Sequence, residues 1–174
     1  FGAVNQTTLG QATADTIINN QYINRIMNSR TTLYRSKYAS HHYDKQLDAL
    51  FSDWFPETSE MDDQDFEFEM KKWMKVSQEC KPTVVYTRCV NFDYPINPDQ
   101  QTWMAQLLNR CWVDLGVKQY LHIVPEGFVT KLSACQMFQE FIDMKLENQF
   151  EIHHFPNEAE AIQWLGVSDT PLTK

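Results

Sequence analysis

The clearest pattern of apolar and polar positions in this chain lies between Lys81 and Gly116. Pro82 is followed by the β-branched and aromatic residues typical of a buried strand, namely Val84, Val85, Tyr86 and Val90. Beyond a proline-bearing turn, large apolar residues recur at three- and four-residue steps, as on the buried face of a helix: Trp103, Leu107, Leu108, Cys111, Trp112 and Leu115. Asn97 and Gln100 predict a capping box at the start of this helix, and Gly116 predicts its end.

Similar patterns predict the elements on either side of this stretch. Strands are expected over residues 31–39, 43–54, 84–90, 117–125 and 150–155, and helices over residues 60–77, 98–115, 131–148 and 158–166. The expected caps of the other helices are Thr58 or Ser59, then Thr130, then Asn157 with Glu160. Residues 43–54 also fit a helix, because their apolar residues are spaced for either structure. We interpret them as a strand that forms a hairpin with residues 31–39, with His41 and His42 in the short turn.

The order of these elements predicts the fold class. After the hairpin, strands alternate with helices long enough to connect parallel strands by right-handed crossovers. We therefore expect an α/β fold with a mixed five-stranded sheet, an initial antiparallel hairpin and helices packed against the sheet. This domain would span residues 31–166, between an N-terminal extension of residues 1–30 and a C-terminal tail of residues 167–174.

The N-terminal extension carries its own apolar stripe. The stripe predicts a helix over residues 12–27 and consists of Ala14, Ile17, Ile18, Tyr22, Ile23, Ile26 and Met27. Two interpretations stay open for this helix. It packs on its own domain, or it docks on a second copy of the chain and makes a homodimer.

Charge and cysteine content narrow the functional classes. The net charge of -8 and the sequence pI near 5.0 disfavour nucleic acid as a partner. No apolar run approaches the roughly 18 residues of a membrane span, and the first residues lack the pattern of a secretory signal. The four cysteines (Cys80, Cys89, Cys111 and Cys135) have no CxxC spacing. We expect them to be buried free thiols of a cytoplasmic protein rather than metal ligands.

Two groups of residues have a chemical interpretation beside a structural one. One histidine each from His41–His42 and His153–His154 could converge on a metal with Asp44 or Glu151, although each pair more simply flanks a strand end. Cys89 and His122 fall in strands that can be neighbours, but a thiol inside a packed sheet is inert. With 5 glycines and no nucleophile elbow, the sequence also lacks a phosphate-binding loop or a catalytic motif. We therefore expect no cofactor, no metal and no enzymatic activity.

Several segments together resemble a known family. The segments KPTVVYTRCVNF, YPINPDQQTW, VKQYLHIV and FPNEAEAIQWL are similar to those of the SpoIIAA-like, or STAS-type, domains. Within that family they most resemble the STAS/SEC14-like group of small uncharacterised bacterial proteins. The resemblance covers residues 31–166 and implies a SpoIIAA-like fold. Its motifs are mostly structural, so it says little about activity.

One departure from the family changes the expected function. Phosphorylation-controlled STAS antagonists of anti-sigma factors carry an Asp-Ser pair where the central strand meets the following helix. The corresponding segment here is NFDYPINPDQ, which keeps Asp93 but has no serine or threonine from Asn91 to Gln101. We therefore do not predict phosphorylation at this turn.

The expected function is that of a regulatory or protein-binding module without enzymatic activity. Its contact surface would be the turn that contains Asp93, Tyr94, Ile96, Asn97 and Asp99, with Tyr94 and Ile96 as the apolar anchors. The alternative is a carrier of a small apolar or lipid-like ligand, which the SEC14-like side of the resemblance allows. The 5 Trp, 11 Phe and 7 Met residues would supply the lining of such a site.

Overall fold

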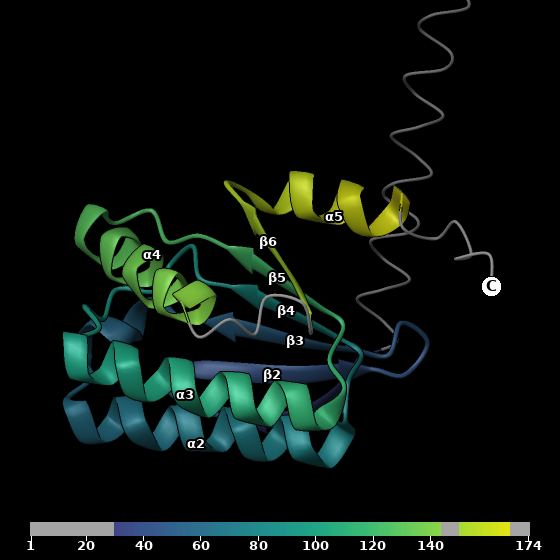
Figure 1. The fold of residues 1–174 in the computed structure, drawn as a ribbon, viewed down its shortest axis with the longest axis horizontal. Coiled ribbons are helices and arrows are strands. Elements are labelled where there is room, and N and C mark those ends of the chain that lie inside the picture. The colour runs from purple at the N-terminus through teal and green to yellow at the C-terminus, as the bar shows by residue number, and fades with distance from the viewer. Residues whose placement is uncertain (1–29, 144–149, 168–174) are drawn as a thin grey trace, which may run out of the picture.

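A computed structural model describes residues 30–143 and 150–167 of the chain, and these residues form a mixed six-stranded sheet with helices on both faces (Figure 1). The strands are β1 (Arg30–Arg35), β2 (Ala39–Asp44), β3 (Ala49–Trp54), β4 (Val84–Arg88), β5 (Gln119–Ile123) and β6 (Glu151–Phe155). They lie side by side in chain order. The first three are antiparallel, and β3 to β6 are parallel. This confirms the α/β class and the mixed sheet.

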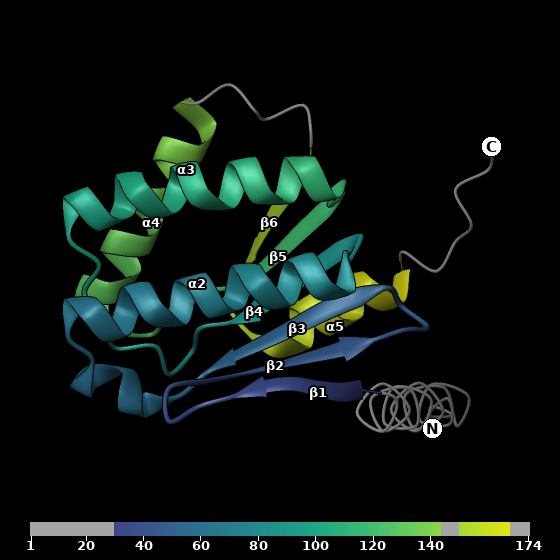
Figure 2. The same cartoon turned by 90° about the horizontal axis from the view of Figure 1, so that it is seen from below.

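Three helices cover one face of the sheet and a fourth covers the other (Figure 2). They are α2 (Asp63–Cys80), α3 (Pro98–Leu115), α4 (Phe128–Asp143) and α5 (Glu158–Val167), and a short 3-10 helix, η1 (Pro56–Glu60), precedes α2. Each of the first three connects a strand to the next one in the sheet, so crossovers of one hand place all three on the same side. No strand follows α5 in the described residues, and this helix folds against the opposite face.

The sheet has six strands, so the expectation of five was wrong. Residues 31–54 form three antiparallel strands, and His41 and His42 lie within the middle one rather than in a turn. Polar side chains stabilise both turns, the one between β1 and β2 and the one between β2 and β3. The Ser36 hydroxyl accepts hydrogen bonds from the amides of Tyr38 and Ala39. In the second turn Asp44 Oδ1 accepts from the amides of residues 46 and 47, and Asp48 has a φ of 47°. Such turns need no glycine or proline, and residues 31–54 contain neither.

The helix caps agree with the sequence at two helices and differ at two. Asn97 with Gln100 forms a capping box at the start of α3, and Gly116 ends it with a φ of 77°. Asn157 with Glu160 likewise caps α5. Helix α2 is capped by Asp62, because Thr58 and Ser59 lie in η1. Helix α4 begins at Phe128, so the expected cap Thr130 lies inside its first turn.

Two apolar cores separate the layers. The larger lies between the sheet and α2, α3 and α4, where the fully buried rings of Trp73 and Trp112 meet edge to face with centroids 5.4 Å apart. The smaller lies under α5 and contains Phe51, Tyr86 and Phe155. Fully burying one such aromatic side chain contributes about 1.5–3 kcal/mol, so these layers dominate the stability of the domain.

Some predictions lie outside the described residues. These are the helix over residues 12–27, its docking on a second copy and the C-terminal tail beyond residue 167. Within the described ranges, no helix combines the length and the apolar character that crossing a bilayer requires.

Candidate functional site

The turn between β4 and α3 holds the residues that the sequence assigns to partner binding. Its side chains alternate, with Phe92, Tyr94 and Ile96 buried and Asp93 and Pro95 exposed. Tyr94 and Ile96 are only 7% and 6% exposed, so the two expected anchors point into the larger core instead of toward a partner. The cause is the extended backbone of this segment, which turns successive side chains to opposite sides.

Tyr94 is held from two directions. Its ring stacks on Phe66 of α2, with centroids 4.9 Å apart. Its hydroxyl donates to Asp63 Oδ1 at 2.6 Å and lies 3.0 Å from Gln100 Oε1. Burial, together with the bond to Asp63, raises the pKa of Tyr94 to about 12, so the phenol stays protonated. The side chain therefore joins the starts of α2 and α3.

The three polar residues of the predicted surface have different positions. Asn97 is half-buried, and its Oδ1 accepts from the Gln100 amide at 3.0 Å, which makes it a helix cap. Asp99 is exposed in the first turn of α3. Asp93 is exposed as well, while its amide donates to the hydroxyl of buried Thr58 at 2.9 Å. Of the predicted residues, Asp93 and Asp99 are therefore the ones that a partner can reach.

Asp93 lies in the wall of a surface hollow of about 340 Å³, which we call the strand-end hollow. Its lining residues follow the carboxyl ends of β3, β4 and β5: Pro56, Ser59, Val90, Asn91, Phe92, Asp93 and Gly127. The carboxyl ends of parallel strands are where open α/β sheets bind their ligands. At Gly127 the wall is tight, because a Cβ atom there would lie 2.7 Å from Thr130 Oγ1.

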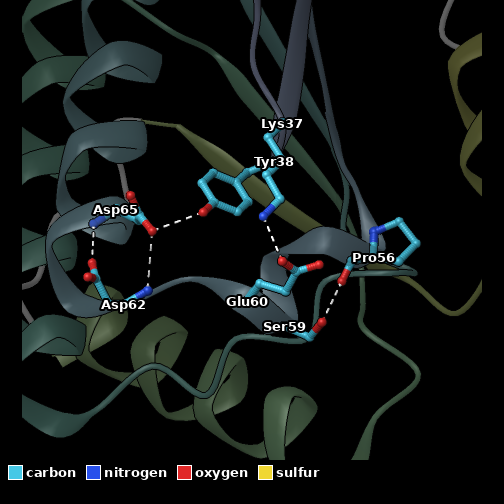
Figure 3. A network of polar contacts seen from close by, with 7 residues as sticks. All are labelled: Lys37, Tyr38, Pro56, Ser59, Glu60, Asp62 and Asp65. Atoms are coloured by element: carbon cyan, nitrogen blue, oxygen red, sulfur yellow. Dashed lines mark hydrogen bonds and ion pairs between the residues drawn. The ribbon is translucent and has the colours of Figure 1, made fainter.

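Further exposed carboxylates lie in the segments that follow β3, β4 and β5: Glu57, Glu60, Asp62, Asp63, Asp99 and Glu126. Figure 3 shows how the β1–β2 turn holds part of this surface in place. Lys37 Nζ lies 2.7 Å from Glu60 Oε2, and the Tyr38 hydroxyl donates to Asp65 Oδ2 at 2.9 Å. The result is an acidic, anchored surface at the carboxyl edge of the sheet.

The histidines do not converge in the way the sequence allowed. His41 and His42 lie on β2 while His153 and His154 lie on β6, with three strands between them and thus about 19 Å of sheet. His154 instead faces His122 of β5, with their Nδ1 atoms 3.3 Å apart. Burial lowers the pKa of His122 to about 3 and also lowers that of His154, so both rings are neutral near pH 7. Among the residues that the structure describes, no three His, Cys, Asp or Glu side chains gather as metal ligands.

The cysteines are buried as expected at two positions, half-buried at one and exposed at one. All four are free thiols; Cys89 and Cys111 are buried, Cys80 is half-buried and Cys135 is exposed. Cys89 and His122 line the same small cavity. Burial raises the pKa of Cys89 far above its ordinary value, which keeps the thiol protonated and a poor nucleophile.

A row of polar side chains crosses the whole sheet on the side of α2, α3 and α4, and its four central members are buried. Strand register places its members side by side, one from each strand: Tyr34, His41, Ser52, Thr87, His122 and His154. His41 is fully buried between the rings of Tyr34 and Trp73, and neither of its ring nitrogens has a hydrogen-bond partner. Burial lowers the pKa of His41 to about 3. The row is invisible in the sequence, because it depends on register between strands far apart in the chain.

Two further concavities bear on the carrier interpretation. One is an open groove of about 680 Å³ along α3, where Trp103 and Leu107 are half-buried. The other is an interior cavity of about 30 Å³ between the sheet and the helices α2, α3 and α4. Pockets for drug-sized ligands measure about 300–1,000 Å³ and enclose most of the ligand. The interior cavity is therefore too small for a lipid-like molecule, and the carrier function stays a prediction.

No protein-family model, curated protein or solved structure matches this chain. The α/β architecture is thus established by the structure itself, while membership of the STAS-type family stays a prediction.

Proposed function

We propose that this chain is a non-enzymatic protein-binding module of STAS-like type, and that a basic segment of its partner occupies the strand-end hollow. The observation that carries the proposal is the position of Asp93. This predicted site residue is exposed and lines a hollow of about 340 Å³, and the segments that follow the neighbouring strand ends carry further exposed carboxylates. A lysine or arginine side chain fits that chemistry.

The backbone around Asp93 supports the proposal because it is already held in place. The Asp93 amide is bound to Thr58, and the Thr58 hydroxyl in turn donates to the carbonyl of Phe55 at 2.8 Å. A carboxylate on such a support loses little conformational freedom when it binds a cation. Ser59 and Asn91 add a hydroxyl and an amide to the wall, which can fix the orientation of a bound side chain.

Charge also favours a basic partner. The chain carries a net charge of -8, and exposed carboxylates in the segments after β3, β4 and β5 place part of it at one edge of the sheet. Complementary charge accelerates encounter and excludes acidic competitors. Among the described residues that line the hollow there is a carboxylate, a hydroxyl and an amide, a set suited to holding a cation.

The test uses a peptide array in which each peptide carries one arginine or lysine, with glutamine in the same position as the reference. Peptides that bind the intact chain are titrated by fluorescence anisotropy against Asp93→Asn and against Asp114→Asn, which removes the same charge at the far end of α3. We expect Asp93→Asn to weaken binding by about tenfold or more, because a hydrogen bond to a charged group is worth about 1.5–3 kcal/mol. Asp114→Asn should leave binding unchanged. Equal affinities of the two variants, or equal binding of the glutamine peptides, would reject the proposal.

A further inference from the structure

The open groove of about 680 Å³ along α3, which we call the α3 groove, combines apolar and polar lining residues. Half-buried Trp103, Leu107 and Val113 form its apolar part. The polar residues of its lining are Gln78, Gln106, Asn109, Arg110 and Asp114. An apolar groove bordered by polar residues is the kind of surface that receives an amphipathic helix.

The chain itself contains a segment that matches the α3 groove. The sequence predicts a helix over residues 12–27, in which seven apolar residues lie between Ala14 and Met27. At about 1.5 Å of rise per residue these positions extend over about 20 Å, and the α3 residues that line the groove extend over about 17 Å. Residues 12–27 carry one acidic and one basic side chain, as the lining of the groove does. Length and charge therefore agree.

The sheet face on the side of α5 does not suit this apolar segment. The contacts of α5 with the sheet are to β5 and β6. Polar side chains that are half-buried or exposed extend to this side from β1 to β4: Thr32, His42, Asp53 and Arg88. Asp53 and Arg88 form an ion pair there, with Oδ1 and Nε 2.8 Å apart. An apolar helix on this face would remove both charges from water, which is unfavourable.

Residues 12–27 are also too close to β1 to reach the α3 groove of their own domain. The edge strand β1 is separated from α3 by α2 (Figure 2). The three steps from Met27 to Arg30 span at most about 11 Å. The chain would have to pass around α2, which with its side chains is about 10–12 Å across. The α3 groove of a second copy is free of this restriction.

We propose that residues 12–27 of each copy dock in the α3 groove of the other copy and thereby join two chains in a homodimer. Each copy offers one helix and one groove, so a two-fold axis gives two identical contacts and a closed assembly. Both partners of each contact gain by burying apolar surface, namely the stripe of residues 12–27 and the side chains of Trp103 and Leu107.

The first part of the test measures mass in solution by light scattering. The intact chain should have twice its chain mass of 20.5 kDa. Ile18→Asp places a carboxylate in the apolar stripe and Leu107→Asp places one in the α3 groove, so each variant should be a monomer. The control Val129→Asp makes the same kind of change at a side chain that is 60% exposed and does not line the groove, and it should stay a dimer.

The second part mixes the two monomeric variants in equal amounts. The intact stripe of Leu107→Asp fits the intact groove of Ile18→Asp, so a dimer should reappear. It should be weaker than the parent dimer, because one of two linked contacts remains. A monomeric parent chain, a mixture without dimer, or a monomeric Val129→Asp would overturn the proposal.

Circular dichroism shows whether each variant is folded. If Leu107→Asp does not fold, Val113→Asp replaces it, because Val113 lines the same groove in the last turn of α3. The residues changed in the stripe and the groove lie outside the strand-end hollow. The result is therefore independent of peptide binding there.

Discussion

Tyr94 stacks face to face on Phe66, and this contact fixes the turn after β4 to the first part of α2. The turn that the sequence offers as a contact surface is thereby also part of the larger core. On the outer side of the turn Asp93 is accessible to a partner, whereas on the inner side Tyr94 stabilises the fold.

Truncation of Tyr94 should destabilise the domain strongly. We expect Tyr94→Ala to lower the free energy of unfolding by about 3–5 kcal/mol, because it removes a large buried ring. Tyr94→Phe keeps the stacking and loses only the hydroxyl contacts to Asp63 and Gln100, so about 1 kcal/mol is expected. Urea denaturation measures both. An unchanged stability of Tyr94→Ala would mean that the side chain is exposed in solution.

Acidification should destabilise the domain through its buried histidines. His41 and His122 have pKa values of about 3 in the folded state, below the roughly 6.5 of an unfolded histidine. The unfolded chain therefore binds more protons, so this stability is present above pH 6.5 and is lost as the pH falls from there toward 3. At pH 5 each histidine should reduce the free energy of unfolding by about 2 kcal/mol relative to pH 7 or above.

The variant His41→Phe isolates one of these two contributions. Its ring can take the place between Tyr34 and Trp73 without a group that titrates. The loss of stability between pH 7 and pH 5 should then be about 2 kcal/mol smaller than in the parent chain. The same pH dependence in parent and variant would show that His41 is not neutralised by burial.

The cap of α2 provides a direct comparison between the expected and the observed start of that helix. Asp62 Oδ1 accepts from the Asp65 amide at 2.8 Å, whereas Ser59 Oγ donates to the Pro56 carbonyl in η1 (Figure 3). We expect Asp62→Ala to cost about 1 kcal/mol of stability, and Ser59→Ala clearly less. Thermal and urea denaturation measure the stability of the two variants. A larger loss of stability in Ser59→Ala than in Asp62→Ala would contradict the structure.

A side chain at position 127 should destabilise the domain while Thr130 is present. The Cβ atom of Gly127→Ala would lie 2.7 Å from Thr130 Oγ1, and that hydroxyl is held by its bond to the Gly127 carbonyl at 3.0 Å. We expect Gly127→Ala to cost about 1–3 kcal/mol, as other cases of overpacking do. The cost should shrink in a Thr130→Ala background, which a double-mutant cycle measures. Strict additivity would show that the close approach to Thr130 is not the cause.

The sequence was sufficient where structure depends on neighbours in the chain. The periodic apolar residues of α3, its cap at Asn97 and its end at Gly116 follow from local rules, and the structure confirms all three. The alternation of strands and helices was likewise enough for parallel pairing of β3 to β6. The sequence predicts two strands in residues 31–54 instead of three for a local reason too. Ser36 and Asp44 stabilise the turns there in place of glycine or proline. The alternation of Phe92, Tyr94 and Ile96 with polar residues and proline is a local sign that these three side chains are buried.

By itself, then, the sequence determined the class of fold, most of the helices and the one turn on which the candidate site depends. Only the tertiary structure decided which side of that turn faces solvent, that Ser59 and Gly127 lie beside Asp93, and that six polar residues form one row. The physical reason is that exposure and register are set by contacts between elements far apart in the chain. Such contacts leave no period in the sequence, because each strand contributes a single residue to the row.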